Sequence, residues 1–220
     1  MPTPNRYRVW RHGALVDEVS DVTALWAPDT VGFLIGCSFS WEARLAAAGL
    51  PPRHLADAAG ANTVPMFRTN VPNVKSGPFG GVLVVSMRPY LPHQLAAVEA
   101  LTEAYPGAHG GPVHWGDPFE LGIGEPPPPA MPGPTGPEAG AGSYVSPETP
   151  AAKAARWRRA VARPDFGDAV ALRDGEVPVF WACGVTPQTA LMAAQLPLAI
   201  THAPGHMFVT DVLIDELRDD

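Results

Sequence analysis

Two short apolar runs, far apart in the chain, share one pattern of residue types. Residues 31–35 lead into Gly36-Cys37-Ser38, residues 177–182 lead into Cys183-Gly184-Val185, and an Ala/Leu-rich stretch of helical character follows each. A buried strand that ends in a tight turn and opens a helix directs backbone N–H groups at one point, as in the ligand sites of open α/β sheets. The pattern therefore predicts two buried strands and a site assembled from two halves.

The spacing of apolar and polar positions predicts the remaining elements. Residues 6–30 indicate an edge hairpin, with its turn at His12-Gly13, or a loop, and residues 81–88 form a β-branched run typical of a buried strand. Residues 92–104 carry apolar side chains at helical spacing, so we expect a helix there. Residues 125–150 contain nine prolines and four glycines among 26 residues, which indicates a solvated loop before a basic helix over 151–162.

Composition narrows the functional class. The net charge of −7 and the pI near 5.4 argue against a nucleic-acid-binding protein, which needs a basic face. No apolar run approaches the roughly 18–20 residues of a membrane helix, and the N-terminus lacks the apolar core of a signal peptide. With only two cysteines, we expect a cytoplasmic protein with reduced thiols that binds neither nucleic acid nor membrane and that could form a homodimer.

The cysteines and two histidines are the first candidates for chemistry. A thiolate at a helix N-terminus can act as nucleophile or base, so Cys37 and Cys183 could form a cofactor-independent racemase, or both could be small buried residues. His202 and His206 are candidate acid/base groups. Pro204-Gly205 between them favours a loop over a helix, so a metal site is not expected.

Two arginines and a second His/Asp pair complete the candidates. Arg68 and Arg88 end apolar strands and could bind a carboxylate in bidentate geometry, or each could form an internal salt bridge. His114 and Asp117 lie in a glycine-rich segment and could act as an acid/base pair, or Asp117 could cap a turn.

Seven segments, in this order, make the chain resemble the D-glutamate cyclase family, whose bacterial members are described as hydro-lyases. They are Gly36-Cys37-Ser38-Phe39-Ser40, Val64-Pro65-Met66-Phe67-Arg68-Thr69-Asn70, Val84-Val85-Ser86-Met87-Arg88-Pro89, Gly111-Pro112-Val113-His114-Trp115-Gly116-Asp117-Pro118, Pro164-Asp165-Phe166-Gly167-Asp168, Pro178 to Gln188 and Thr201 to Asp211.

The resemblance implies an α/β fold with a three-layer α/β domain, built on a mixed sheet, and a smaller two-layer α+β domain. We assign residues 1–75 and 165–220 to the main domain, 76–124 to the smaller one, and 125–164 to a Pro/Gly-rich insertion with the basic helix.

The resemblance also implies a lyase activity that interconverts D-glutamate and 5-oxo-D-proline with loss or gain of water and needs no cofactor. It supplies no catalytic positions, so the site residues rest on the patterns above. The alternatives are a non-catalytic binding module for a small acidic metabolite and the two-cysteine racemase. The expected catalytic residues are His202, His206, His114, Asp117, Cys183 and Cys37, and the expected substrate-binding residues are Arg68, Asn70, Arg88, Ser38, Gly184, Thr186 and Gln188.

Overall fold

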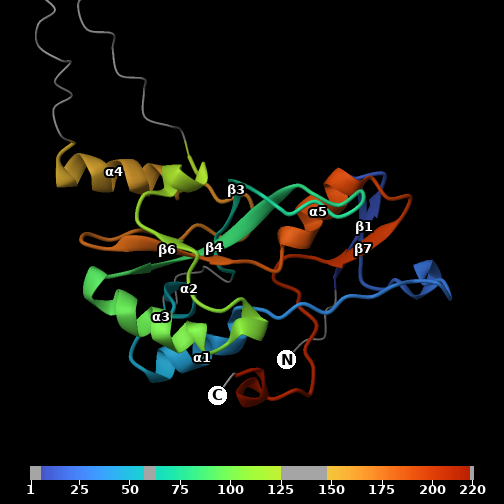
Figure 1. Cartoon of the computed structure of the whole chain (residues 1–220), viewed down its shortest axis with the longest axis horizontal. Coiled ribbons are helices and arrows are strands. Elements are labelled where there is room, and N and C mark those ends of the chain that lie inside the picture. The colour runs from blue at the N-terminus through green and yellow to red at the C-terminus, as the bar shows by residue number, and fades with distance from the viewer. Residues whose placement is uncertain (1–5, 57–62, 125–147, 219–220) are drawn as a thin grey trace, which may run out of the picture.

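The computed structural model describes residues 6–56, 63–124 and 148–218 of the 220-residue chain (Figure 1). Its strands are β1 (Tyr7–Arg11), β2 (Ala14–Val19), β3 (Met66–Pro72), β4 (Val82–Tyr90), β5 (His114–Trp115), β6 (Val177–Ala182) and β7 (Ala199–His202). Its α-helices are α1 (Phe39–Ala47), α2 (Arg53–Ala56), α3 (Leu95–Glu103), α4 (Pro150–Ala160) and α5 (Thr186–Ala194). Single 3₁₀ turns occur at Thr23–Leu25, Pro92–Gln94, Pro106–Ala108, Pro118–Leu121 and Ile214–Leu217.

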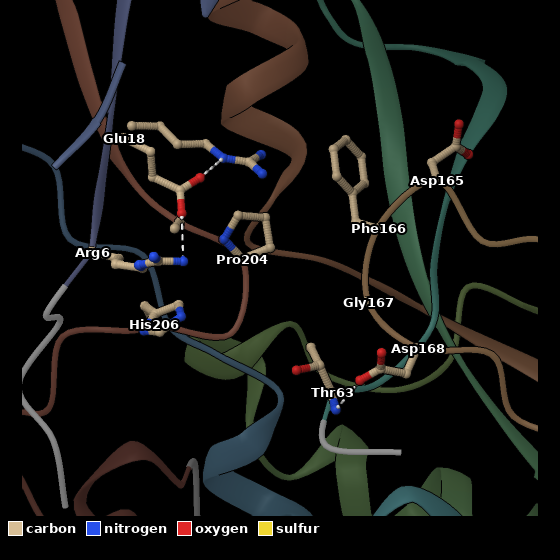
Figure 2. A pocket seen from close by; sticks show the side chains of 11 residues that line it. Arg6, Glu18, Thr63, Asp165, Phe166, Gly167, Asp168, Pro204 and His206 are labelled. Atoms are coloured by element: carbon tan, nitrogen blue, oxygen red, sulfur yellow. Dashed lines mark hydrogen bonds and ion pairs between the residues drawn. The ribbon is translucent and has the colours of Figure 1, made fainter. Parts of the chain in front are cut away.

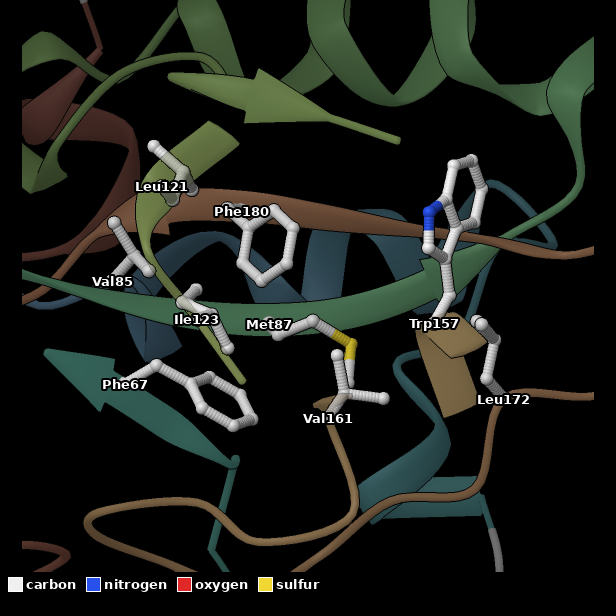
Figure 3. Close-up of a cluster of buried hydrophobic side chains, with 9 residues drawn as sticks. All are labelled: Phe67, Val85, Met87, Leu121, Ile123, Trp157, Val161, Leu172 and Phe180. Carbon is white, nitrogen blue, oxygen red and sulfur yellow. The ribbon is translucent and has the colours of Figure 1, made fainter. Parts of the chain in front are cut away.

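A four-stranded sheet in the order β3-β4-β6-β5 forms the centre of the molecule. Side chains of a strand alternate between the two faces of its sheet. Val85 and Met87 of β4 enter an apolar cluster beneath α4 (Figure 3), whereas Arg88 contacts the rings of Trp41 and Trp181 beneath α1 and α3. Helices therefore cover both faces of this sheet (Figure 1).

The strand directions differ from the prediction. Every strand pair in the described ranges is antiparallel, so the predicted mixed sheet is wrong. Antiparallel neighbours need only a short connection, and residues 73–81 supply one between β3 and β4. The sheet joins β3 and β6, from the predicted main domain, to β4 and β5, from the predicted smaller one.

A second, three-stranded sheet in the order β2-β1-β7 contains the predicted hairpin. His12 and Gly13 take positive φ angles of 48° and 76° at its turn, as a two-residue hairpin turn requires. In β1, Tyr7 pairs with His202 and Arg8 with Thr201, so this sheet joins the first described strand to the last.

The predicted buried strand over residues 31–36 is wrong. Phe33 and Leu34 are 83% and 80% exposed, and the segment is irregular up to α1. A short apolar run does not specify which strand would pair with its backbone. The second unit is confirmed, because β6, the turn at Cys183-Gly184 and α5 follow one another as expected.

The predicted helices are confirmed in kind and place. α1, α3 and α5 fall within the expected stretches, and α4 matches the basic helix predicted for 151–162. Thr149 caps α4 by accepting a hydrogen bond from the Ala152 N–H. No helix in the described ranges is both long and apolar enough to cross a membrane.

Candidate functional site

A pocket of about 380 Å³, called the charged pocket below, lies between the three-stranded sheet and the loop that precedes Val170. Figure 2 shows Arg6, Glu18 and His206 on one side of it and Asp165 and Asp168 on the other. Side chains of both charges therefore face one small volume. Its lining consists of Arg6, Arg8, Glu18, Thr63, Asp165, Phe166, Gly167, Asp168, Ala203, Pro204 and His206.

The basic side of the charged pocket is held by hydrogen bonds at strand β1. Arg8 Nε donates to Glu18 Oε2 at 3.3 Å, and Arg6 Nη1 lies 3.2 Å from Glu18 Oε1. Arg8 Nη1 donates to Gln188 Oε1 at 3.1 Å. Among the described residues, none accepts a hydrogen bond from Arg8 Nη2, so the protein's acceptors lie at the Nε and Nη1 edges of this guanidinium.

The acidic side is a tight loop around Gly167. Asp165 Oδ2 accepts from the Arg68 N–H at 2.8 Å, and Asp168 Oδ2 accepts from the Thr63 N–H at 3.0 Å. Gly167 has φ +74°, and a Cβ added there would lie 2.2 Å from the Val64 carbonyl oxygen. Glycine is therefore required at this position, and the loop fixes the two carboxylates against the pocket.

Of the two histidines of the Thr201–Phe208 motif, His206 lines the pocket, whereas His202 is the last residue of β7 and is not among the lining residues. His206 ends a turn in which its N–H donates to the Ala203 carbonyl at 2.9 Å, and its side chain lines the pocket. Burial lowers the pKa of His202, and the charges of Arg8 and His206 act in the same direction. His202 is therefore a neutral imidazole near pH 7.

Arg88 forms the centre of a second polar group, which is buried under α1. The side chain is 0% exposed, donates to Ser86 Oγ and Ser38 Oγ at 3.0 Å each, and is paired with Glu42. The sequence left two roles open for Arg88, carboxylate binding and an internal salt bridge, and the structure shows the salt bridge. Burial alone would raise the pKa of Glu42, but the charges and hydrogen bonds of Arg88 and His54 together hold it below its usual value.

The two cysteines lie beside this buried group. Burial raises the pKa of Cys37, and burial raises the pKa of Cys183 to about 11. Backbone hydrogen bonds from Phe39 and Val185 act in the opposite direction but do not overcome burial. Both side chains are therefore neutral thiols near pH 7.

Alkylation tests this state of the thiols. We expect iodoacetamide at pH 7 to modify Cys183 about a hundredfold more slowly than a free cysteine, because the thiolate fraction is small. The rate should continue to rise towards pH 11, and unfolding in urea should restore ordinary reactivity. Rapid modification of the folded protein at pH 7 would show that a thiolate is present.

Comparison with known proteins identifies the family to which the chain belongs. A family model described as D-glutamate cyclase matches residues 31–134 and 158–211, which is most of the chain. The chain belongs to the D-glutamate cyclase family. The residues that the model leaves unmatched between these segments fall within the predicted insertion at 125–164.

Three bacterial relatives, each named "Putative hydro-lyase", are similar over nearly the whole chain. The protein from Cupriavidus necator is 48% identical over 208 residues, which are 94% of this chain and 63% of the relative. Those from Burkholderia multivorans and Rhodococcus jostii are each 47% identical over 206 residues, covering 94% of this chain and 65% and 64% of the relative. The chain thus spans just under two thirds of the length of these D-glutamate cyclase family relatives.

The family motifs distribute the predicted site residues over three places. His206 lines the charged pocket, and Gln188 and Arg68 contact pocket residues from outside, Gln188 through Arg8 and Arg68 through the Phe166 ring at 5.3 Å. Five predicted residues lie at or beside the buried group: Ser38, Arg88, Cys37, Cys183 and Gly184. Arg88 donates a hydrogen bond to Ser38, and its charge acts on both thiols. A Cβ added at Gly184 would lie 3.8 Å from His109 Nε2.

The remaining predicted residues make structural hydrogen bonds. His114 Nε2 lies 3.0 Å from the Asp117 carbonyl oxygen, and the Asp117 carboxylate accepts from Phe119 N–H and pairs with Arg156. This matches the turn-capping alternative for Asp117. Asn70 Nδ2 donates to the Glu120 carbonyl at 3.3 Å, and Thr186 Oγ1 bonds the backbone of Val84.

Sequence reasoning missed Arg8, Asp165, Asp168 and His109. The two aspartates had a signal, because they flank a glycine in a family motif, whereas Arg8 had none. His109 takes φ +80°, which is unusual for a residue with a side chain, and its buried Nε2 has no partner in the described ranges. Burial and the charge of Arg88 lower the pKa of His109 to about 4.

Proposed function

We propose that this protein is a hydro-lyase of the D-glutamate cyclase type, which interconverts D-glutamate and 5-oxo-D-proline plus water at the charged pocket. The single observation that carries the proposal is the pocket itself. Arg6 and Arg8 face Asp165 and Asp168 across about 380 Å³, beside the half-buried imidazole of His206. A zwitterionic amino acid with a second carboxylate needs groups of both signs on opposite walls.

In this proposal, the basic side binds carboxylate. The free Nη2 edge of Arg8 faces a substrate carboxylate, and Arg6 offers a second cation on the same side. Glu18 pairs with both arginines and thereby orients them. A ligand can therefore bind Arg8 only through the outer edge of the guanidinium. The substrate ammonium lies towards Asp165 and Asp168.

The reaction moves two protons from the substrate nitrogen to one γ-oxygen, because the ammonium carries three protons and the lactam nitrogen keeps one. The imidazole of His206 takes the first proton from the substrate ammonium, and the free amine then attacks the γ-carboxyl carbon. The C–N bond forms as the carbonyl π bond opens. The protonated His206 returns this proton to a γ-oxygen, then takes a second proton from the newly bonded nitrogen and passes it to the same oxygen. That oxygen departs as water when the lactam carbonyl forms. The positive guanidinium of Arg6 or Arg8 stabilises the tetrahedral oxyanion between these steps.

The racemase alternative requires a thiolate at Cys37 or Cys183. Burial raises the pKa of both thiols, so each would be a weak base near neutral pH. The cyclase proposal uses neither cysteine. Replacement of both by serine should therefore leave cyclisation in place and would abolish racemisation.

An NMR time course of the purified protein with D-glutamate, L-glutamate and 5-oxo-D-proline tests the proposal. We expect interconversion of the two D-compounds and no reaction of L-glutamate. Broadening of the D-glutamate lines without turnover would contradict catalysis and favour the binding module. Racemisation of either glutamate isomer, lost on Cys→Ser replacement, would favour the two-cysteine enzyme.

A further inference from the structure

Gln188 lies directly behind the charged pocket and is 1% exposed. It belongs to the first turn of α5 and is not part of the pocket lining. Its Oε1 accepts from Arg8 Nη1 at 3.1 Å, and its Nε2 donates to the His202 carbonyl at 3.2 Å. One buried amide thus joins the pocket arginine on β1 to the last residue of β7.

These two bonds restrict the rotation of the Arg8 guanidinium. Glu18 fixes the Nε edge and Gln188 fixes Nη1, which leaves Nη2 as the outward edge. An arginine side chain has several rotatable bonds, and ordering it at the moment of binding would cost conformational entropy. A guanidinium already held from behind avoids that cost and presents its donors in one direction.

The amide of Gln188 is itself held in one orientation. The Gln188 carbonyl oxygen accepts from Arg8, and its NH₂ group donates to the His202 carbonyl. In the flipped amide, the NH₂ group would face the Arg8 N–H and the oxygen would face the His202 carbonyl oxygen, so neither hydrogen bond could form. Burial without these partners would be costly, so the side chain has no alternative arrangement in this position.

We propose that Gln188 is a positioning residue that orients Arg8 for carboxylate binding in the charged pocket. The assignment rests on the proposed function for the substrate, and on the two hydrogen bonds for the role. It differs from the direct substrate contact that the sequence predicts for Gln188. Loss of the amide should weaken carboxylate binding and leave the proton transfer at His206 unchanged.

Steady-state kinetics with D-glutamate test this role in four variants: Gln188→Met, Arg8→Met, their combination, and Thr189→Val. Gln188→Met keeps the length of the side chain and should raise KM about tenfold with kcat nearly unchanged. In the Arg8→Met background, Gln188→Met should add no further increase in KM, because the residue it positions is gone. Additive effects on KM would mean that Gln188 acts independently of Arg8, and would overturn the proposal.

Thr189→Val is the matched control for a merely structural effect. Thr189 is the next residue of α5, 6% exposed, and its Oγ1 donates to the carbonyls of Val82 and Thr186 without contacting the pocket. We expect this variant to lower the melting temperature and to leave KM unchanged. An equal rise of KM in Thr189→Val and Gln188→Met would mean that Gln188 only stabilises the fold, and would contradict the positioning role.

A second readout separates this proposal from the proposed function. The NMR signals of the Arg8 side-chain N–H groups can be titrated with acetate, which carries only the carboxylate. Acetate should shift these signals in the wild type, with an apparent Kd about tenfold higher in Gln188→Met. If the wild type shows this response but does not convert D-glutamate, only the proposed function fails. If Gln188→Met and wild type respond alike, the positioning role fails, whatever the turnover.

Discussion

Replacement of His206 by alanine is expected to lower kcat/KM for D-glutamate by about 10²–10⁴-fold, the range for loss of a general acid/base. His206 is the imidazole that lines the charged pocket, and the proposed reaction uses it for both proton transfers. Because the group acts in the chemical step, kcat should account for most of the loss. Wild type and variant should be compared by initial rates and by thermal unfolding.

His93→Ala is the matched control for this prediction. His93 is exposed in the 3₁₀ turn at Pro92–Gln94 and does not line the pocket, so its replacement should change neither rate nor stability. A folded His206→Ala protein with wild-type turnover would remove His206 from the mechanism. The same loss of rate in both variants would indicate an effect unrelated to the pocket.

Replacement of Arg88 by methionine is expected to destabilise the fold by about 3–5 kcal/mol, the usual cost of leaving one charge of a buried pair without its partner. Glu42 would remain in the interior, 3% exposed, opposite an apolar side chain. The Arg88 guanidinium also lies 4.6 Å from the Trp41 ring and 5.3 Å from the Trp181 ring, contacts that methionine replaces only in part. Urea unfolding at pH 7 measures the loss.

Two further variants control this result. Arg44→Met removes an exposed pair with Asp215 and should hardly change the unfolding midpoint, because such pairs are screened by water. The double variant Arg88→Met, Glu42→Met removes both buried charges and should regain part of the stability. If Arg88→Met were as stable as Arg44→Met, the buried pair would not support the fold.

The pH dependence of stability gives a second test of the same pair. The folded state holds the pKa of Glu42 below its unfolded value, so its contribution is present above the unfolded pKa and is lost as pH falls through the folded one. In Arg88→Met, burial would act without its main counterweight and raise the pKa of Glu42, so protonation of Glu42 would favour the folded state and the stability difference from wild type should shrink as pH falls. A stability difference between Arg88→Met and wild type that stays the same at every pH would contradict the coupling between Glu42 and Arg88.

Local patterns specified most of the elements and the family. The β-branched run at β4, the helical spacing of α3, the hairpin turn at His12-Gly13 and the polar start of α4 each depend on neighbours within a few residues. The motif at Gly36-Cys37-Ser38 was one of the seven segments that indicated the family, although the apolar run before it is exposed rather than buried.

Local sequence patterns could not predict which residues pair with the charged side chains. Nothing near Arg88 in the sequence indicates that it pairs with Glu42, 46 positions away, rather than with a substrate. His206 was a candidate from its loop, but Arg8 and Asp168, which face the same pocket, come from distant segments.

The sequence alone therefore determined where the helices and most strands form and which family the chain resembles, because these depend on periodicity, turn residues and local motifs. Only the tertiary structure decided the antiparallel order of the strands, the exposure of residues 31–36 and the places of two arginines, Arg88 in a buried ion pair and Arg8 in the lining of the pocket. These depend on which surfaces of the whole chain are buried against one another. A buried charge needs a partner within the protein, whereas a charged side chain that lines a pocket remains accessible from outside.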